Sequence, residues 1–282
     1  MRWSSSWRLA VMAGVLVSLG GCLEISPDNL VQTGDGERLL SRCAADLPSR
    51  QAIRGEAALP RSFALTSWNI RKTLQQGWEQ GLDTWAGQAD LLLLQEAVDK
   101  PDLTDWLQQR AMRWQQVTAF RYEGVSMGVL TAAKVPAVYS CALKLSEPAV
   151  RLPKSTLVNL YPIEGSSIPL LVINLHAINF ELGMAAWRDE IRQLGRWAKR
   201  HRGPVIVAGD FNSWGSKRSA LLEQEMRRAN LTEVAWQPEA RVQVLGEPLD
   251  HIYYRGLQVD VAIVTPTTAS DHNPLQARFT VQ

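Results

Sequence analysis

The sequence predicts one large α/β (α+β) domain, because apolar runs of strand length alternate with amphipathic helical stripes. Leu91 to Leu94, within residues 90–96, and residues 205–208 form continuous apolar runs, which are typical of strands buried inside a sheet. In residues 181–200 the apolar side chains instead recur at helical spacing. No Gly/Ser/Pro-rich linker divides the 282 residues, so we expect a single folded unit after the amino-terminal region.

The composition supplies a sizeable core and argues against a wholly basic, nucleic-acid-binding surface. Apolar residues make up 46% of the chain and charged residues 21%. The formal net charge is only +2, so charge alone does not identify the class of partner. A local basic groove remains compatible with these numbers.

The amino terminus has the features of an export signal. Residues 1–8 carry two arginines, residues 9–19 are apolar and uncharged, and Gly20-Gly21-Cys22 follows. The apolar run is shorter than the ~20 residues that span a bilayer. Residues 19–22 resemble the lipobox of bacterial lipoproteins, which implies cleavage before Cys22 and acylation of its sulfur. The expected location is then the bacterial cell envelope, either the outer membrane, which Leu23 after the cysteine favours, or the periplasmic face. The alternative is an ordinary signal peptide cleaved nearby.

We therefore divide the chain into a signal peptide (residues 1–21), a tether with an irregular lead-in (22–61) and a folded domain (62–282). Export would place Cys43 and Cys141 in an oxidising compartment, where they can form a disulfide. Two buried free thiols are the alternative.

Within the domain, hydrophobic periodicity predicts a series of strands and helices. A helical stripe of Leu74, Trp78, Leu82 and Trp85 follows the first strand, and Asp99 or Asp102 could cap a later helix. The expected strands are residues 62–69, 90–96, 127–131, 155–160, 168–175, 205–208, 259–264 and a terminal strand through Val281. The other expected helices are residues 101–112, 181–200 and 219–229.

Several of these strands end in polar side chains that suit phosphate or metal chemistry. Asp210 and Asn212 follow residues 205–208 and, being two apart on extended chain, can project the same way. A carboxylate beside a neutral amide suits a hard cation or a phosphate oxygen. Glu96 and His176 end two other strands. The alternatives are an Asx turn at Asp210 and a structural, hydrogen-bonded histidine.

Six short motifs occur in an order that resembles the endonuclease/exonuclease/phosphatase superfamily of DNase I-like and exonuclease III-like enzymes. The motifs are Trp68-Asn69-Ile70, Gln95-Glu96, Asn174-Leu175-His176, Gly209-Asp210-Phe211-Asn212, Leu249-Asp250 and Ser270-Asp271-His272. The short segments around residues 177–180 and 254–257 are most similar to the YafD-like bacterial branch of this superfamily. The resemblance implies a four-layer sandwich, in which two mixed β-sheets pack face to face with helices on both outer faces.

The same resemblance assigns a metal cluster to Asn69, Glu96 and Asp271, whose oxygen atoms suit Mg²⁺ or Mn²⁺. It places Asp210 and Asn212 at the scissile phosphate or a second metal position.

The resemblance also makes His272 the general base that takes a proton from the attacking water, with Asp250 fixing its tautomer. It places His176 on the far side of the phosphate. His251 departs from the family pattern, which usually has an aromatic residue at that position.

The expected function is that of a lipid-anchored, metal-dependent hydrolase of phosphate esters, most similar to nucleases that cleave phosphodiester bonds. The alternatives are a phosphomonoesterase, a phospholipid head-group hydrolase and a catalytically silent binding lipoprotein. The expected partners are a phosphate-ester substrate, either nucleic acid or phospholipid, and a membrane; we expect a monomer. The insertions with which family nucleases grip a duplex are not found in the sequence.

Overall fold

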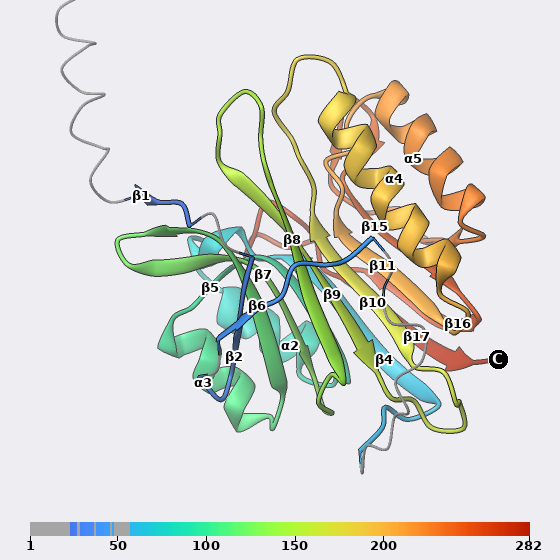
Figure 1. Ribbon diagram of the computed structural model, residues 1–282. Coiled ribbons are helices and arrows are strands. Elements are labelled where there is room, and N and C mark those ends of the chain that lie inside the picture. Colours follow the sequence, from blue (N-terminus) through green and yellow to red (C-terminus); the bar gives the residue numbers. More distant parts are fainter. Residues whose placement is uncertain (1–22, 27–28, 37, 46, 48–56) are drawn as a thin grey trace, which may run out of the picture.

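The computed structural model describes residues 23–26, 29–36, 38–45, 47 and 57–282. Two mixed β-sheets pack face to face, and helices cover both outer faces (Figure 1). The four-layer sandwich expected from the motifs is therefore the observed fold. The expected signal peptide and Cys22 lie outside the described residues.

Nine strands of the described chain form the first sheet, in the order β16-β17-β4-β5-β7-β6-β2-β3, with β1 pairing β6. Their bounds are β1 Leu23–Glu24, β2 Leu30–Thr33, β3 Arg38–Leu40, β4 Ser62–Asn69, β5 Leu91–Val98, β6 Arg113–Tyr122, β7 Val125–Ala133, β16 Leu257–Val264 and β17 Leu275–Val281.

Six strands of the described chain form the second sheet, in the order β12-β15-β11-β10-β9-β8. Their bounds are β8 Tyr139–Ser146, β9 Pro153–Tyr161, β10 Leu170–His176, β11 Val205–Asp210, β12 Thr232–Glu233 and β15 Asp250–Arg255. A separate small hairpin consists of β13 (Gln243–Val244) and β14 (Glu247–Pro248).

Each sheet has its outer face covered by a pair of helices. α2 (Trp78–Ala86) and α3 (Pro101–Gln109) cover the first sheet, and α4 (Ala185–Arg200) and α5 (Ser216–Arg228) cover the second (Figure 1). A short 3-10 segment, η1 (Arg71–Thr73), follows β4. Within the described ranges, every helix is too short or too polar to cross a membrane.

Continuous apolar strands arise here because both faces of each sheet are buried. Leu91 and Leu93 of β5 point into the core between the sheets, whereas Leu92 and Leu94 pack under α2 and α3. β11 follows the same alternation, with Ile206 in the inter-sheet core. Successive side chains on a strand point to opposite faces, so a strand between two layers needs apolar residues at every position.

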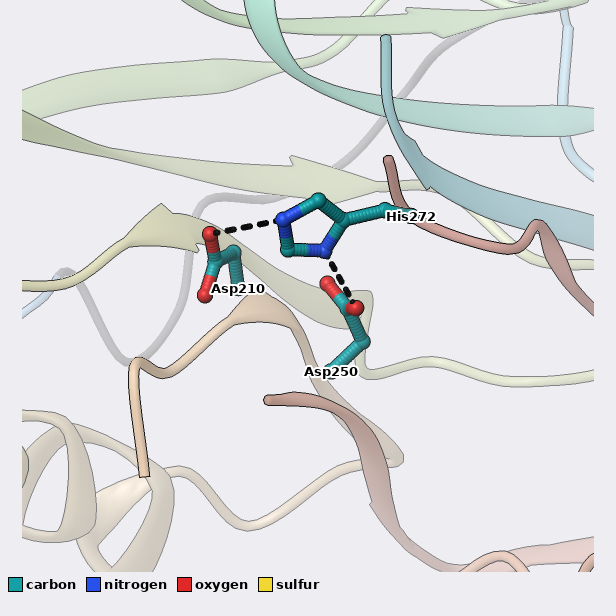
Figure 2. Close-up of side chains that lie close together, drawn as sticks. All are labelled: Asp210, Asp250 and His272. Carbon is teal, nitrogen blue, oxygen red and sulfur yellow. Dashed lines mark hydrogen bonds and ion pairs between the residues drawn. The ribbon is translucent and has the colours of Figure 1, made fainter. Parts of the chain in front are cut away.

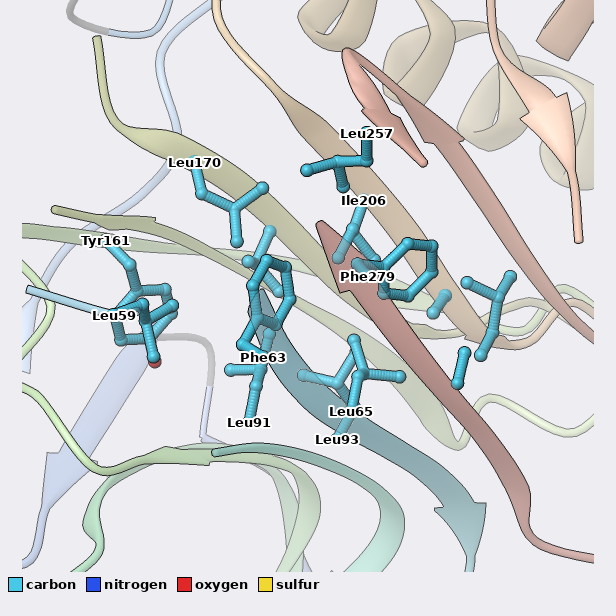
Figure 3. Close-up of a cluster of buried hydrophobic side chains, with 14 of the residues drawn as sticks. Leu59, Phe63, Leu65, Leu91, Leu93, Tyr161, Leu170, Ile206, Leu257 and Phe279 are labelled. Atoms are coloured by element: carbon cyan, nitrogen blue, oxygen red, sulfur yellow. The ribbon is translucent and has the colours of Figure 1, made fainter. Parts of the chain in front are cut away.

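The inter-sheet core fixes how the two sheets sit on each other. Phe63 and Leu65 of β4 face Leu170 of β10 and Ile206 of β11, and all four side chains are almost fully buried (Figure 3). Burying side chains of this size stabilises the fold by about 1.5–3 kcal/mol each. This packing holds the ends of β4, β5, β10 and β11 in a common frame.

Some sequence expectations about local structure were wrong. The lead-in is not irregular throughout, because β1, β2 and β3 lie within it and join the first sheet. Leu74 lies before α2 and is mostly exposed. α3 begins after Lys100 without a side-chain cap, and Asp99 instead accepts a hydrogen bond from Gln32.

Cys43 and Cys141 form the expected disulfide, which joins the lead-in to β8. The backbone N–H of Cys43 also donates to the carbonyl of Ala142. The two cysteines lie 98 residues apart in the chain. The bond therefore closes a large loop in the unfolded chain and restricts its conformational freedom.

Replacing both cysteines with alanine should lower the free energy of unfolding by about 2–5 kcal/mol. Urea unfolding followed by circular dichroism would measure the loss. Dithiothreitol should destabilise the wild-type protein by a similar amount and leave the double variant unchanged. Equal stability of oxidised and reduced wild-type protein would contradict the prediction.

Candidate active site

Strand pairing brings the polar strand ends together at one end of the sandwich, called here the catalytic end. β10 and β11 run parallel, so His176 lies beside Asp210. β15 runs antiparallel to β11, and its first residue, Asp250, lies on the other side of Asp210. In the first sheet, β4 and β5 run parallel and Asn69 pairs with Gln95.

The loop between β16 and β17 brings His272 to the same end. The indole N–H of Trp68 donates to the backbone carbonyl of His272 at 2.9 Å. The Ser270 hydroxyl donates to the carbonyl of Asn69 at 2.6 Å and accepts the His272 backbone N–H at 3.2 Å. These bonds tie the loop to the end of β4 and fix the backbone of the imidazole-bearing residue.

Two of the expected site residues occupy a backbone conformation that non-glycine residues rarely adopt. Glu96 has φ of 51° and Asn212 has φ of 48°. Glu96 lies where the register between β5 and β7 shifts, between Leu94 and Ala97. A bulge redirects a side chain, and positive φ costs on the order of 1–3 kcal/mol, so the surrounding structure maintains this conformation against its strain.

His272 and Asp250 form a buried carboxylate–imidazole pair (Figure 2). Nδ1 of His272 lies 2.6 Å from Oδ2 of Asp250, while Nε2 points towards Oδ2 of Asp210 at 3.9 Å. Burial alone would lower the pKa of His272, but Asp250, Asp210 and Asp271 outweigh it and raise the pKa to about 10. The arrangement therefore stabilises the imidazolium that a proton-accepting His272 becomes.

Asp210 is the centre of the hydrogen-bond network. One oxygen accepts the side-chain amide of Asn69 at 3.1 Å, and the other accepts the backbone N–H of Asn212 at 2.9 Å. Burial raises the pKa of Asp210 to about 6, with Asp250 acting in the same direction. Asn212 is itself held by a bond from its amide to the carbonyl of Ala177.

His176 contacts Lys154, a residue that the sequence analysis did not select. Nε2 of His176 lies 2.6 Å from the Lys154 ammonium and 3.4 Å from Asp210. Burial and the positive charge of Lys154 hold the pKa of His176 well below its usual value. His176 is therefore neutral at pH 7, and its Nε2 accepts a hydrogen bond from Lys154. Lys154 carries the positive charge on this side of the site.

The three expected metal ligands present oxygen atoms at the catalytic end, and each has a polar partner. The Glu96 carboxylate pairs with Lys72, and Asp271 lies 3.2 Å from Arg71. The Asn69 side-chain oxygen accepts the backbone N–H of Arg71 at 3.0 Å. Two carboxylates and an amide oxygen are the donors that Mg²⁺ or Mn²⁺ prefers, so the donor chemistry fits such an ion.

Asp210, Asp250 and His272 form a second possible metal set, with ligand atoms within 4.8 Å of one another. Within it, the Asp250 oxygen and His272 Nδ1 already share a short hydrogen bond. A metal ion held by this set would need a histidine nitrogen as a ligand, which Mg²⁺ does not favour. We interpret this set as a proton-transfer group rather than a metal site.

A buried amide pair joins the two sheets directly beneath the site. The side chain of Gln95 donates to Asn174 at 2.7 Å, and Asn174 donates to the carbonyl of Leu130 at 2.9 Å. Gln95 precedes Glu96, and Asn174 lies two residues before His176. The bond therefore sets the separation of the strand ends that carry these two site residues.

Glu190 of α4 supports the chain that leaves β10. Its carboxylate accepts the backbone N–H of Ile178 at 3.0 Å. Burial raises the pKa of Glu190 from 4.5 to about 7, although the Ile178 N–H opposes the shift. An acid with a raised folded-state pKa binds its proton more tightly in the folded protein, so its contribution to stability falls as the pH rises between these two values.

We expect Glu190→Gln, which keeps an acceptor for Ile178, to remove this pH dependence. Between pH 4.5 and pH 7 the wild-type protein should lose about 3 kcal/mol of unfolding free energy relative to the variant. Urea unfolding across this range would measure the difference. Parallel stability curves for the two proteins would refute the assignment.

His251 fills the position where the family usually has an aromatic residue, and it has a structural role. Its ring is buried, stacks on Tyr253 at 5.6 Å and meets Phe211 edge to face. Its nitrogens contact Glu233 at 2.6 Å and Ser213 at 2.8 Å. Both nitrogens therefore contact residues other than the Asp250–His272 pair.

The sequence analysis missed the basic residues of the site. Arg71 and Lys72 directly follow the Trp68-Asn69-Ile70 motif, so their position was a usable signal. Lys154 at the start of β9 has no such signal, because only the antiparallel pairing of β9 with β10 brings it near His176.

Known bacterial proteins are similar to this chain over most of its length. The chain is 40% identical over 256 residues to the UPF0294 protein of Yersinia enterocolitica, covering 91% of this chain and 93% of the relative. It is 39% identical over 215 residues to a UPF0294 protein of Vibrio campbellii, covering 76% of each chain.

Solved structures show the same fold at low sequence identity. The human Nocturnin catalytic domain with bound sulfate is 17% identical, with a TM-score of 0.60 over 80% of this chain and 97% of that one. ANGEL2, a 2',3'-cyclic phosphatase in complex with adenosine-2',3'-vanadate, is 14% identical, with a TM-score of 0.59 over 78% and 96%. Residues 66–272 match the model of the Endonuclease/Exonuclease/phosphatase family, to which this chain therefore belongs.

Proposed function

We propose that this protein is a divalent-metal-dependent phosphodiesterase that uses a water molecule activated by His272. The Asp250–His272 pair carries the proposal, because Asp250 occupies Nδ1 and leaves Nε2 directed towards Asp210. A water molecule hydrogen-bonded to Nε2 would be placed beside a second acceptor, Asp210. This is the arrangement that general-base catalysis requires.

The hydrolysis balances with the groups present. The water oxygen forms a bond to phosphorus and its proton passes to Nε2 of His272. The bond between phosphorus and the leaving oxygen breaks, and that oxygen takes up a proton from solvent water. His272 then releases its proton to solvent, which regenerates the base. Asp250 stabilises the resulting imidazolium, while Lys154 and the Asn212 amide supply positive or donor groups for the growing charge on the phosphate.

Glu96, Asn69 and Asp271 would hold the metal ion, for which Mg²⁺ or Mn²⁺ fits the oxygen donors. Bound there, the ion would polarise the phosphate oxygens and, through its charge, lower the pKa of His272 towards neutrality. A diester substrate is also compatible with ANGEL2, because a 2',3'-cyclic phosphate is a phosphodiester.

Hydrolysis of bis(p-nitrophenyl) phosphate by the full-length protein tests this function. We expect turnover with Mg²⁺ or Mn²⁺, loss with EDTA and recovery when the metal is restored. Preference for p-nitrophenyl phosphate would favour a phosphomonoesterase. Absence of turnover on both compounds at any metal concentration would favour a silent binding protein and overturn the proposal.

We further propose that the protein is exported and anchored through an acylated Cys22, which the lipobox-like residues 19–22 support. Mass spectrometry of the exported protein should find diacylglycerol on an amino-terminal Cys22. An unmodified amino terminus downstream of Cys22 would exclude the anchor.

A further inference from the structure

The large apolar side chains that the described residues leave exposed concentrate at the catalytic end. Six of them form what we call the apolar rim: Leu23, Leu74, Tyr122, Val150, Phe180 and Leu182. The loops at the opposite end of the sheets, residues 87–90, 134–138, 162–169 and 201–204, have no exposed large hydrophobic residue. This asymmetry distinguishes the rim from the scattered apolar exposure of ordinary surfaces.

The members of the rim lie in segments that continue from the strand ends at the catalytic end. Leu74 follows β4 and η1, just beyond Asn69. Phe180 and Leu182 follow His176 at the end of β10, and Val150 lies in the β8–β9 loop. The two loops meet, because the N–H of Ala149 donates to the carbonyl of Phe180 at 3.2 Å. Figure 1 shows both loops extending beyond the same end of the second sheet.

The most exposed members of the rim contribute little to the packing of the folded chain. Leu182 is 99% exposed and Leu74 is 73% exposed. A leucine that is exposed to water loses the ~1.5–3 kcal/mol that burial would supply. Several such residues around one site are typical of a surface that inserts into an apolar phase.

The start of the described chain also lies at this end. Leu23 pairs with Tyr122 at the tip of the β6–β7 hairpin, and this tip extends past Val98, the last residue of β5. Leu23 directly follows Cys22. An acyl group on Cys22 would thus be one residue from the rim, without the flexible spacer that would let the domain face in any direction.

We infer that the catalytic end docks on a phospholipid bilayer through the apolar rim, so that the phosphodiester substrate is a lipid head group at the membrane surface. The choice of substrate rests on the proposed phosphodiesterase function, whereas the docking does not. A bilayer would receive the acyl chain proposed for Cys22 and would bury the rim side chains that surround the site. Free nucleic acid would leave those side chains in water.

Depth-dependent fluorescence quenching tests the docking without measuring activity. Single-cysteine variants Leu182→Cys and Ser167→Cys can be labelled with an environment-sensitive dye, since Cys43 and Cys141 are joined in a disulfide. Ser167 is the control, because it is exposed in the β9–β10 loop at the opposite end. The full-length labelled proteins would be reconstituted into vesicles of phosphatidylethanolamine and phosphatidylglycerol that contain spin-labelled lipid.

We expect strong quenching of the dye at position 182 and little at position 167. Equal quenching at the two positions, or stronger quenching at 167, would overturn the inference. If the wild-type protein hydrolyses no phosphodiester, the proposed function fails while this measurement still decides the docking.

A second experiment tests the substrate through a ratio of rates. Head-group release from vesicles and hydrolysis of bis(p-nitrophenyl) phosphate would be measured for the wild type, Leu182→Glu and Val261→Glu. Val261 is the matched control, because it is an exposed apolar residue in the middle of edge strand β16. The ratio of vesicle rate to soluble rate should fall about tenfold for Leu182→Glu and remain unchanged for Val261→Glu. Cleavage of plasmid DNA with no release from vesicles would exclude the lipid substrate.

Discussion

Replacing His272 with alanine is expected to lower phosphodiester turnover by about 100- to 10,000-fold, the range typical of a lost general base. Nε2 of His272 faces Asp210 at 3.9 Å and is the ring nitrogen left available by the Asp250 bond. Alanine removes this proton acceptor but leaves the backbone carbonyl that binds Trp68. The loss should therefore appear in turnover rather than in the fold, which circular dichroism would check.

Asp250→Asn should reduce turnover by a comparable factor. An amide at this position either donates to Nδ1, which places the proton on Nε2, or accepts without the charge that stabilises the imidazolium. The Asp250/His272 double variant should be little worse than either single variant, because groups that act as one unit are non-additive. Fully additive losses of turnover in the double variant would contradict the interpretation that Asp250 and His272 act as one unit.

His251→Phe is the matched control for these variants. It removes a buried histidine that adjoins Asp250 in sequence, yet both its nitrogens contact other residues. Since phenylalanine supplies the aromatic ring that the family usually has there, turnover should stay near the wild-type value. Near wild-type turnover in His272→Ala would overturn the assigned base.

The sequence could predict the strands of the inner layers and the polar residues at their ends. In β5 and β11 both faces are buried, so every position is apolar until the strand leaves the core, and the change to Glu96 or Asp210 is visible in the sequence. The order of the motifs then indicated which strand ends meet. Local pattern and tertiary position agree for these residues.

Other features depend on pairings that no local pattern records. β1 and β3 are two and three residues long and are strands because neighbouring strands supply hydrogen-bond partners. α4 begins at Ala185 rather than at residue 181, because the Glu181 carboxylate accepts the N–H groups of Ala186 and Trp187 from outside the helix. Lys154 likewise joins the site only through the register of β9 with β10.

Glu96→Gln should weaken divalent-metal binding by about tenfold to 100-fold, a loss at least as large as that seen for residues that merely support metal ligands. The variant keeps the shape of the side chain and the bulge that directs it but removes the charge. Part of the lost turnover should return at high metal concentration, which would separate this variant from His272→Ala. Titration of the full-length protein with Mn²⁺, followed by calorimetry or electron paramagnetic resonance, would measure the affinity directly.

Lys72 forms a salt bridge with Glu96. Removing its charge should therefore change the metal affinity in the opposite direction to Glu96→Gln. A metal ion that binds Glu96 competes with the Lys72 ammonium for the same carboxylate, since two cations held by one carboxylate repel each other. Lys72→Met, which keeps much of the side-chain length without the charge, should therefore tighten Mn²⁺ binding, whereas Glu96→Gln weakens it. If neither variant changes the affinity, the metal does not bind at Glu96. Because the readout is binding rather than turnover, any contact of Lys72 with the substrate does not affect the result.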